Sequence, residues 1–342
     1  MKEFRGYSHG INLGGWLSQC DHTKERYDNF ITQEDLRIIA QWGLDHVRIP
    51  VDYNLVQDEN GRCIEEGFKY IEKALEWCGK YGLNMILDLH KTFGYSFDKG
   101  EQEAGFFDNE DYQERFYTLW EEFAKRFGSY SNRLAFELLN EVTDKEFSDK
   151  WNKISTRCIE AIRAFAPDIK ILLGGYYNNS IEALKDLPYP VDENVVYNFH
   201  CYEPLIFTHQ GAPWVDKMDT DFRMPFESTY GEYIDNTAAN TLLTAKEMAG
   251  FDREALLGDE YFEMLVSEAV RVANERKVAL YCGEFGVINR AAPEDALKWY
   301  RMICRCLDKY GIARAAWSYR EMDFGIADKN MDAVREDILE VL

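Results

Sequence analysis

The sequence has no excess of basic residues: 39 Lys and Arg stand against 61 Asp and Glu, a formal net charge of -22. Nucleic acids and anionic membranes need a basic contact face, so this balance argues against both as partners. It suits a protein that acts on a neutral ligand. We interpret most of the acidic surface as a solvated face.

Long apolar runs are also missing. No stretch approaches the roughly 18–20 residues of a transmembrane helix. The first residues, Met1 to Gly10, lack the apolar centre of a secretion signal. We therefore expect a cytoplasmic protein, although a secreted chain whose signal peptide had been removed would look the same. We also expect a monomer.

The eight cysteines show neither zinc-finger spacing nor a Cys-x-x-Cys motif, and we interpret them as reduced, mostly core thiols. Cys304 and Cys306 are two residues apart, which is a poor ligand geometry on a helix. No Gly-rich phosphate turn follows the last two expected strands, which argues against a sugar-phosphate isomerase. We predict no metal and no cofactor.

Short apolar segments alternate with amphipathic helical patterns along the whole chain. The expected strands are Gly10–Leu17, His46–Pro50, Asn84–His90, Leu134–Glu141, Lys170–Gly175, Asn194–Tyr202, Val278–Gly283 and Ala313–Tyr319. The expected helices span 32–42, 67–81, 111–127, 150–165, 181–187, 260–276, 293–310 and 332–342. Such alternation indicates a parallel sheet, and eight repeats predict a closed (β/α)₈ TIM barrel, one catalytic domain over residues 1–342.

One connection is much longer than the rest. Residues 203–258 separate the sixth expected strand from its helix, whereas the usual connection has about 2–6 residues. The segment is rich in aromatic residues, Trp214 among them. Since a long insertion after a barrel strand lies over the active face, we expect a small lid or subdomain at this position, with a surface excursion of no functional role as the alternative.

Polar or aromatic side chains follow seven of the eight expected strands. They are Asn12 with Trp16, Arg48, His90, Asn140 with Glu141, His200 with Tyr202, Glu284, and Trp317. The carboxyl ends of barrel strands converge on one pocket, so we expect these side chains to meet there. Packing does not explain so many polar groups, because buried polar groups need partners.

Two of these residues, Glu141 and Glu284, are carboxylates, and a carboxylate pair facing across a pocket is the machinery of glycoside hydrolysis. We expect them to lie about 5 Å apart, close enough for direct attack on a sugar. Arg48 beside Glu284 is expected to hold its pKa down.

The neighbours of the pair also receive expected roles. Asn140 is a candidate for bonding a sugar 2-hydroxyl. Tyr202 is expected to orient Glu284, and His200 to orient Glu141. For Glu137, inside its strand, we expect a structural ion pair within the barrel.

With these residues in this order, the sequence resembles glycoside hydrolase family 5, the large cellulase family of the (β/α)₈ clan. The matching motifs, in family order from residue 10 to about 319, are Gly-Ile-Asn-Leu-Gly-Gly-Trp, His-Val-Arg-Ile-Pro, Leu-Asp-Leu-His, Glu-Leu-Leu-Asn-Glu, Asn-Phe-His-x-Tyr, Gly-Glu-Phe-Gly and Ala-Trp-Ser-Tyr. The resemblance implies a retaining mechanism with Glu141 as acid/base and Glu284 as nucleophile. It also implies pocket roles for Arg48, His90, Asn140, His200, Tyr202 and Trp317.

The tryptophans and one departure from the family pattern bear on the substrate. We interpret Trp317 as a sugar-stacking platform and Trp214 as a candidate distal contact, and leave Trp16 between platform and packing. Where similar proteins have a second histidine after Leu-Asp-Leu-His, this chain has Lys91, a cation at the expected rim.

We therefore expect a retaining endo-β-1,4-glucanase, similar to the intracellular-type endoglucanases of the family. The alternatives on the same site are a β-mannanase, a mixed-linkage β-glucanase (lichenase) and an exo-acting β-glucosidase. From another class, a non-catalytic glycan-binding protein is the competing interpretation, which the presence of both glutamates disfavours.

Overall fold

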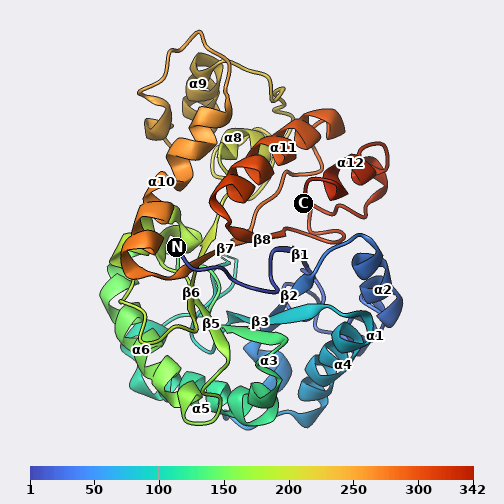
Figure 1. The fold of residues 1–342 in the computed structure, drawn as a ribbon, viewed down its shortest axis with the longest axis vertical. Coiled ribbons are helices and arrows are strands. Elements are labelled where there is room, and N and C mark those ends of the chain that lie inside the picture. The colour runs from blue at the N-terminus through green and yellow to red at the C-terminus, as the bar shows by residue number, and fades with distance from the viewer. Residues whose placement is uncertain (99) are drawn as a thin grey trace.

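The computed structural model describes residues 1–98 and 100–342. Eight parallel strands close into a barrel in chain order, with β8 pairing back onto β1 (Figure 1). They are β1 His9–Asn12, β2 His46–Asp52, β3 Asn84–Lys91, β4 Leu134–Glu137, β5 Lys170–Leu173, β6 Val195–His200, β7 Ala279–Glu284 and β8 Ala313–Ala316. The predicted (β/α)₈ TIM barrel is confirmed.

Helices connect the strands and surround the barrel. The α-helices are α1 Lys24–Asn29, α2 Gln33–Gln41, α3 Tyr53–Val56, α4 Glu65–Tyr81, α5 Glu110–Phe127, α6 Ser148–Arg163, α7 Tyr176–Asn179, α8 Leu205–Thr208, α9 Tyr230–Asn240, α10 Asp259–Arg276, α11 Pro293–Tyr310 and α12 Arg335–Leu339. The 3₁₀ turns are η1 Phe106–Asp108, η2 Gly128–Tyr130, η3 Lys145–Phe147, η4 Ile181–Asp186, η5 Lys246–Met248 and η6 Lys329–Met331.

Local sequence explains where several of these elements begin and end. A capping box begins α2, in which the Asp35 carboxylate accepts the backbone N–H of Thr32 at 2.8 Å. The fourth strand is shorter than predicted, and its pairing with both β3 and β5 ends at Glu137. The expected helix over 181–187 is the 3₁₀ turn η4.

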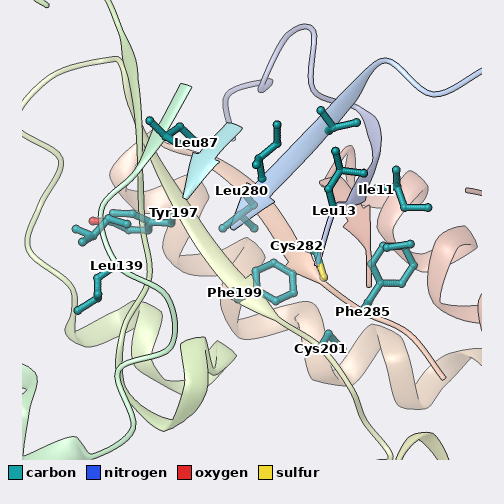
Figure 2. Close-up of a cluster of buried hydrophobic side chains, with 14 of the residues drawn as sticks. Ile11, Leu13, Leu87, Leu139, Tyr197, Phe199, Cys201, Leu280, Cys282 and Phe285 are labelled. Carbon is teal, nitrogen blue, oxygen red and sulfur yellow. The ribbon is translucent and has the colours of Figure 1, made fainter. Parts of the chain in front are cut away.

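The strands separate two apolar layers. Ile86, Val196 and Tyr281 belong to a small cluster that fills the barrel interior. Their sequence neighbours Leu87 and Leu280 belong instead to the large cluster between strands and helices, part of which is drawn in Figure 2. This is the period-2 alternation of strand side chains, and it fixes which residues of each strand point to the barrel axis.

The long segment 203–258 contains α8, α9 and η5. Of these, α9 lies farthest from the barrel, at the top of Figure 1, and α8 lies between it and the strands. Its aromatic residues Phe207, Phe226, Tyr230 and Tyr233 are buried and continuous with the main core. The apolar packing of the barrel therefore extends into the insertion. Among residues 1–98 and 100–342, no helix is both long and apolar enough to cross a bilayer.

Candidate active site

A layer of polar side chains lies directly above the apolar floor of the barrel. Asp88 follows Ile86 by two positions in β3, Asn198 follows Val196 in β6, and Glu137 of β4 lies at the same level as Asp88. Because alternate strand residues share a face, these polar groups point to the same axis as the apolar residues below them. All three are completely buried, so each needs a polar partner.

Arg48 of β2 is the partner of two of them, since its Nη2 lies 3.0 Å from an Asp88 carboxylate oxygen and Glu137 accepts two of its hydrogen bonds. Its Nε and Nη2 donate to the two carboxylate oxygens of Glu137 at 2.7 and 2.8 Å. Its Nη1 donates to Glu284 Oε1 at 2.8 Å and to the side-chain oxygen of Asn12 at 2.9 Å. Its Nη2 also donates to the side-chain oxygen of Asn140 at 2.9 Å. These five hydrogen bonds match the five N–H groups of a guanidinium. The structural ion pair predicted for Glu137 is confirmed.

The two candidate catalytic carboxylates meet on one side of this network. An oxygen of Glu141, an oxygen of Glu284 and a ring nitrogen of His200 all lie within 4.8 Å of one another. The two carboxyls therefore meet, as predicted, with no more than 4.8 Å between these oxygens. The predicted orienting contacts are also present: His200 Nδ1 lies 2.8 Å from Glu141 Oε1, and the Tyr202 hydroxyl donates to Glu284 Oε2 at 3.0 Å.

An extra residue in β7 turns the Glu284 side chain toward Glu141 and the barrel axis. The register between β6 and β7 shifts just before His200, which pairs with Glu284 and leaves Gly283 as the extra residue. A Cβ on Gly283 would come within 2.5 Å of the Asn198 side-chain oxygen, so glycine is the residue that fits. Without the extra residue, simple alternation would turn Glu284 away from the axis.

Burial controls the proton affinities of the pair. It raises the pKa of Glu141 to about 7, against smaller lowering effects from Asn178 and Arg48. It also raises the pKa of Glu284 to about 7, and the attraction of His200 and Arg48 recovers only part of the shift. Arg48 does lower the pKa of Glu284, as expected, but lost hydration outweighs the cation and the net shift is upward. Near neutral pH two carboxyls this close share a proton.

The remaining predicted substrate contacts lie around the pair. His90 is held through Nδ1 by Asp88 at 2.5 Å, and its Nε2 lies 3.5 Å from the Asn140 amide nitrogen. The Trp317 ring lies parallel to His90, with centroids 5.9 Å apart. Trp214 of the insertion is 48% exposed, in an aromatic group with His209 and Phe324 that adjoins Tyr202.

Three residues predicted to contact substrate, Asn12, Trp16 and Arg48, are completely buried and bonded within the protein. Trp16 has no exposed surface, and it packs parallel to Trp77 and donates its Nε1–H to a backbone carbonyl. Asn12 is equally buried, with its amide nitrogen on backbone carbonyls of β7 and β8. Arg48 is buried and bonded to the carboxylates and amides described above. All three residues support the site from behind, because they lie below the layer that faces solvent.

The cation expected at the rim is also not free. Lys91 is only 4% exposed. Its ammonium group bonds the Glu101 carboxylate and lies 3.8 Å from Asp52. Lys91 is therefore a buried cation whose charge is neutralised within the protein, and not a free cation at the rim.

Sequence reasoning missed several residues of the site. Asp88 and Asn198 each stand two positions before a predicted site histidine in a strand, and that spacing places them on the same face. Asn178, which donates to Glu141 Oε2 at 2.9 Å, comes from the turn after β5, the one strand end to which no site residue was assigned.

Glu141, His200 and Glu284 also form the one group among the described residues with metal-like spacing. The Arg48 guanidinium already binds Glu284 and opposes a second cation there. The arrangement favours proton transfer and nucleophilic attack by the carboxyls.

Comparison with known proteins agrees with this geometry. A family model described as Cellulase (glycosyl hydrolase family 5) matches residues 4–323. The chain is 50% identical over 314 residues to cellodextrinase A of Ruminococcus flavefaciens, covering 92% of this chain and 86% of that one. It is 37% identical over 340 residues to endoglucanase C of Acetivibrio thermocellus, covering 97% of both. The solved cellulose synthase subunit Z of Clostridioides difficile superposes with a TM-score of 0.78 at 25% identity, covering 98% of this chain and 99% of that one.

Proposed function

Because the chain belongs to the cellulase family, glycosyl hydrolase family 5, and is a glycoside hydrolase, we propose that it is a retaining endo-β-1,4-glucanase that cleaves β-glucan chains and cello-oligosaccharides. The observation that carries this proposal is the spacing of Glu141 and Glu284, with oxygens within 4.8 Å. Retaining enzymes have carboxyls about 5–5.5 Å apart, whereas inverting enzymes leave about 6.5–9.5 Å for a water.

In the first step the Glu284 carboxylate attacks the anomeric carbon and forms an ester bond to it. The bond from that carbon to the glycosidic oxygen breaks, and the proton of Glu141 passes to the departing oxygen. Glu141 is left ionised, and the shortened glucan leaves with a new hydroxyl.

In the second step water attacks the same carbon. The Glu141 carboxylate takes a proton from the water, the new carbon–oxygen bond forms, and the ester bond to Glu284 breaks. Both carboxyls return to their starting states, so no proton is gained or lost over the cycle.

Hydrogen bonding decides which carboxyl attacks. Glu284 accepts from the Arg48 guanidinium and the Tyr202 hydroxyl, and a charged donor stabilises a carboxylate more than a neutral one does. Glu141 has only neutral donors, Asn178 and His200, since burial lowers the pKa of His200 to about 4. The shared proton therefore resides on Glu141, which acts as the acid.

The surroundings of the pair provide a sugar site. We assign Asn140 to the 2-hydroxyl, because its amide nitrogen has only a long contact of 3.5 Å to His90. Trp317 serves as the stacking platform beside the pair, and Trp214 as a more distant contact. In this proposal the segment 203–258, which carries Trp214, is a lid beside the glucan.

Trapping with a 2-deoxy-2-fluoro cellobioside carrying a good leaving group tests the proposal, because the fluorine slows breakdown of the ester. Peptide mass analysis should place the label on Glu284, and Glu284→Gln should take up none. A label on another residue would contradict the assignment of Glu284 as nucleophile. Cellohexaose should yield internal cleavage products from the first turnovers, whereas glucose as the first product would indicate exo action.

A further inference from the structure

A four-residue turn follows β5 and lies against the acid/base carboxyl. In this turn Tyr177, Asn178 and Asn179 have positive φ angles of 52°, 58° and 55°. Non-glycine residues rarely adopt this left-handed conformation, and three in succession are much rarer. Such strain persists only where the surroundings hold it, so its position beside Glu141 points to a role.

Backbone hydrogen bonds tie the turn to the segment that carries Glu141. The N–H of Tyr177 donates to the carbonyl of Thr143 at 3.1 Å, and the N–H of Asn178 donates to that of Val142 at 3.0 Å. These two acceptors directly follow Glu141, whose own φ is 41°. The turn and the acid/base residue therefore form one bonded unit.

Two amides of the turn reach the catalytic groups. Asn178 Nδ2 donates to Glu141 Oε2 at 2.9 Å, and Asn179 Nδ2 lies 3.4 Å from His200 Nε2. With Nε2 as an acceptor, the neutral imidazole carries its proton on Nδ1 and donates it to Glu141 Oε1. Oε2 of Glu141 thus accepts a hydrogen bond from the turn itself, and Oε1 accepts one from His200 of β6, whose other ring nitrogen faces Asn179 of the turn.

The strand end is shaped to allow this contact. A Cβ on Gly174 would lie 2.1 Å from the Asn179 side-chain oxygen, so the turn can fold over β5 only because residue 174 has no side chain. Asn179 is buried, whereas Asn178 and Tyr177 are exposed. The Asn178 contact therefore lies on the solvent side of Glu141.

We propose that Asn178 is a positioning residue for the acid/base step: presented by the left-handed turn, its amide orients Glu141 and stabilises the ionised carboxylate. The inference rests on the proposed function, in which Glu141 is ionised between the two steps. Its effect falls on the second step, because only there must Glu141 start as a base. Nothing in this role requires Asn178 to touch the glucan.

Several other charged or titratable groups face Glu141. They are Arg48 from β2, Asp88 from β3, Tyr95 from the loop after β3, Glu137 from β4, His200 from β6, Tyr202 from the loop after β6, and Glu284 from β7. These groups stay in place when Asn178 alone is replaced. A change in the titration of Glu141 between parent and variant therefore reports the amide.

Asn178→Gly tests the proposal with little strain, since glycine adopts a φ of 58° freely. The substrate is 2,4-dinitrophenyl β-cellobioside, whose good leaving group makes the second step rate-limiting. Loss of the amide raises the pKa of Glu141, so the acid limb of the kcat profile should move up by about one pH unit. Asn178→Asp, which replaces the donor with a like charge, should move the limb further in the same direction.

Tyr177→Gly is the matched control, because it relaxes the same turn and keeps the amide; its acid limb should stay at the parental pH. An unshifted limb in Asn178→Gly and Asn178→Asp, or a uniform loss of kcat at every pH, overturns the inference. A parent that hydrolyses neither aryl cellobioside nor cello-oligosaccharides overturns the proposed function itself. An active parent labelled at Glu284, with unshifted variants, overturns only the role of Asn178.

Discussion

The substitution Glu137→Gln tests how much the buried charge network stabilises the barrel. Glu137 accepts two hydrogen bonds from Arg48 and one from Asn198, all between 2.7 and 2.8 Å. Glutamine has the same shape, but its NH₂ group would face at least one of these donors. Removing one partner of a buried ion pair costs about 3–5 kcal/mol. Asp88 and Glu284 still neutralise Arg48, which places the expected loss at about 3 kcal/mol.

This loss of unfolding free energy corresponds to a measurable decrease in the melting temperature, Tm. An unfolding entropy of about 2.1 cal/mol/K per residue over 342 residues gives about 0.7 kcal/mol/K, so Tm should fall by about 4 °C. Urea titration gives the free energy directly. Glu268→Gln is the control, because its pair with Arg271 is surface-exposed and should change stability by less than about 0.5 kcal/mol. Equal urea midpoints for the two variants would refute the reasoning.

The same variant has a predicted effect on pH dependence. With Glu137 neutral, Arg48 has one anion fewer to satisfy and attracts Glu284 more strongly. The pKa of Glu284 should therefore fall, and the acid limb of kcat/KM should move to lower pH. A limb that moves to higher pH would show that Glu137 does not compete for Arg48.

Other substitutions distinguish residues that contact the substrate from residues that only stabilise the fold around the site. Trp317→Ala should raise KM for cellotetraose about tenfold through lost stacking. Trp16→Ala should lower the unfolding free energy by about 3–5 kcal/mol and leave KM unchanged. If Trp16→Ala raised KM and Trp317→Ala only destabilised the fold, the two roles would be exchanged. Lys91→Met should destabilise the fold without changing the relative rates on β-glucan and mannan, and a changed ratio would return Lys91 to the substrate site. For the parent, kcat/KM should be bell-shaped, falling at low pH as Glu284 is protonated and at high pH as Glu141 loses its proton; a flat acid limb would contradict this assignment.

The sequence by itself determined the barrel and the meeting of its two carboxylates. Eight apolar segments alternate with amphipathic helices, and this pattern predicts a parallel barrel. It can be read locally, because the spacing of apolar residues within each segment indicates whether that segment forms a strand or a helix. In such a barrel the strand ends converge, so Glu141 and Glu284 had to approach one another. The contacts of His200 and Tyr202 followed from the same convergence.

Only the tertiary structure decided which side chains reach solvent and what each charge experiences. Trp317 keeps 6% of its surface exposed, whereas Trp16 and Arg48, which also stand near strand ends, have none, because packing and the charge network bury them completely. The net pKa of Glu284 depends on the balance of lost hydration against Arg48, and no sequence pattern carries that balance. Asn178 meets Glu141 only because a left-handed turn folds across a neighbouring strand end, a contact set by three-dimensional packing and not by spacing along the chain.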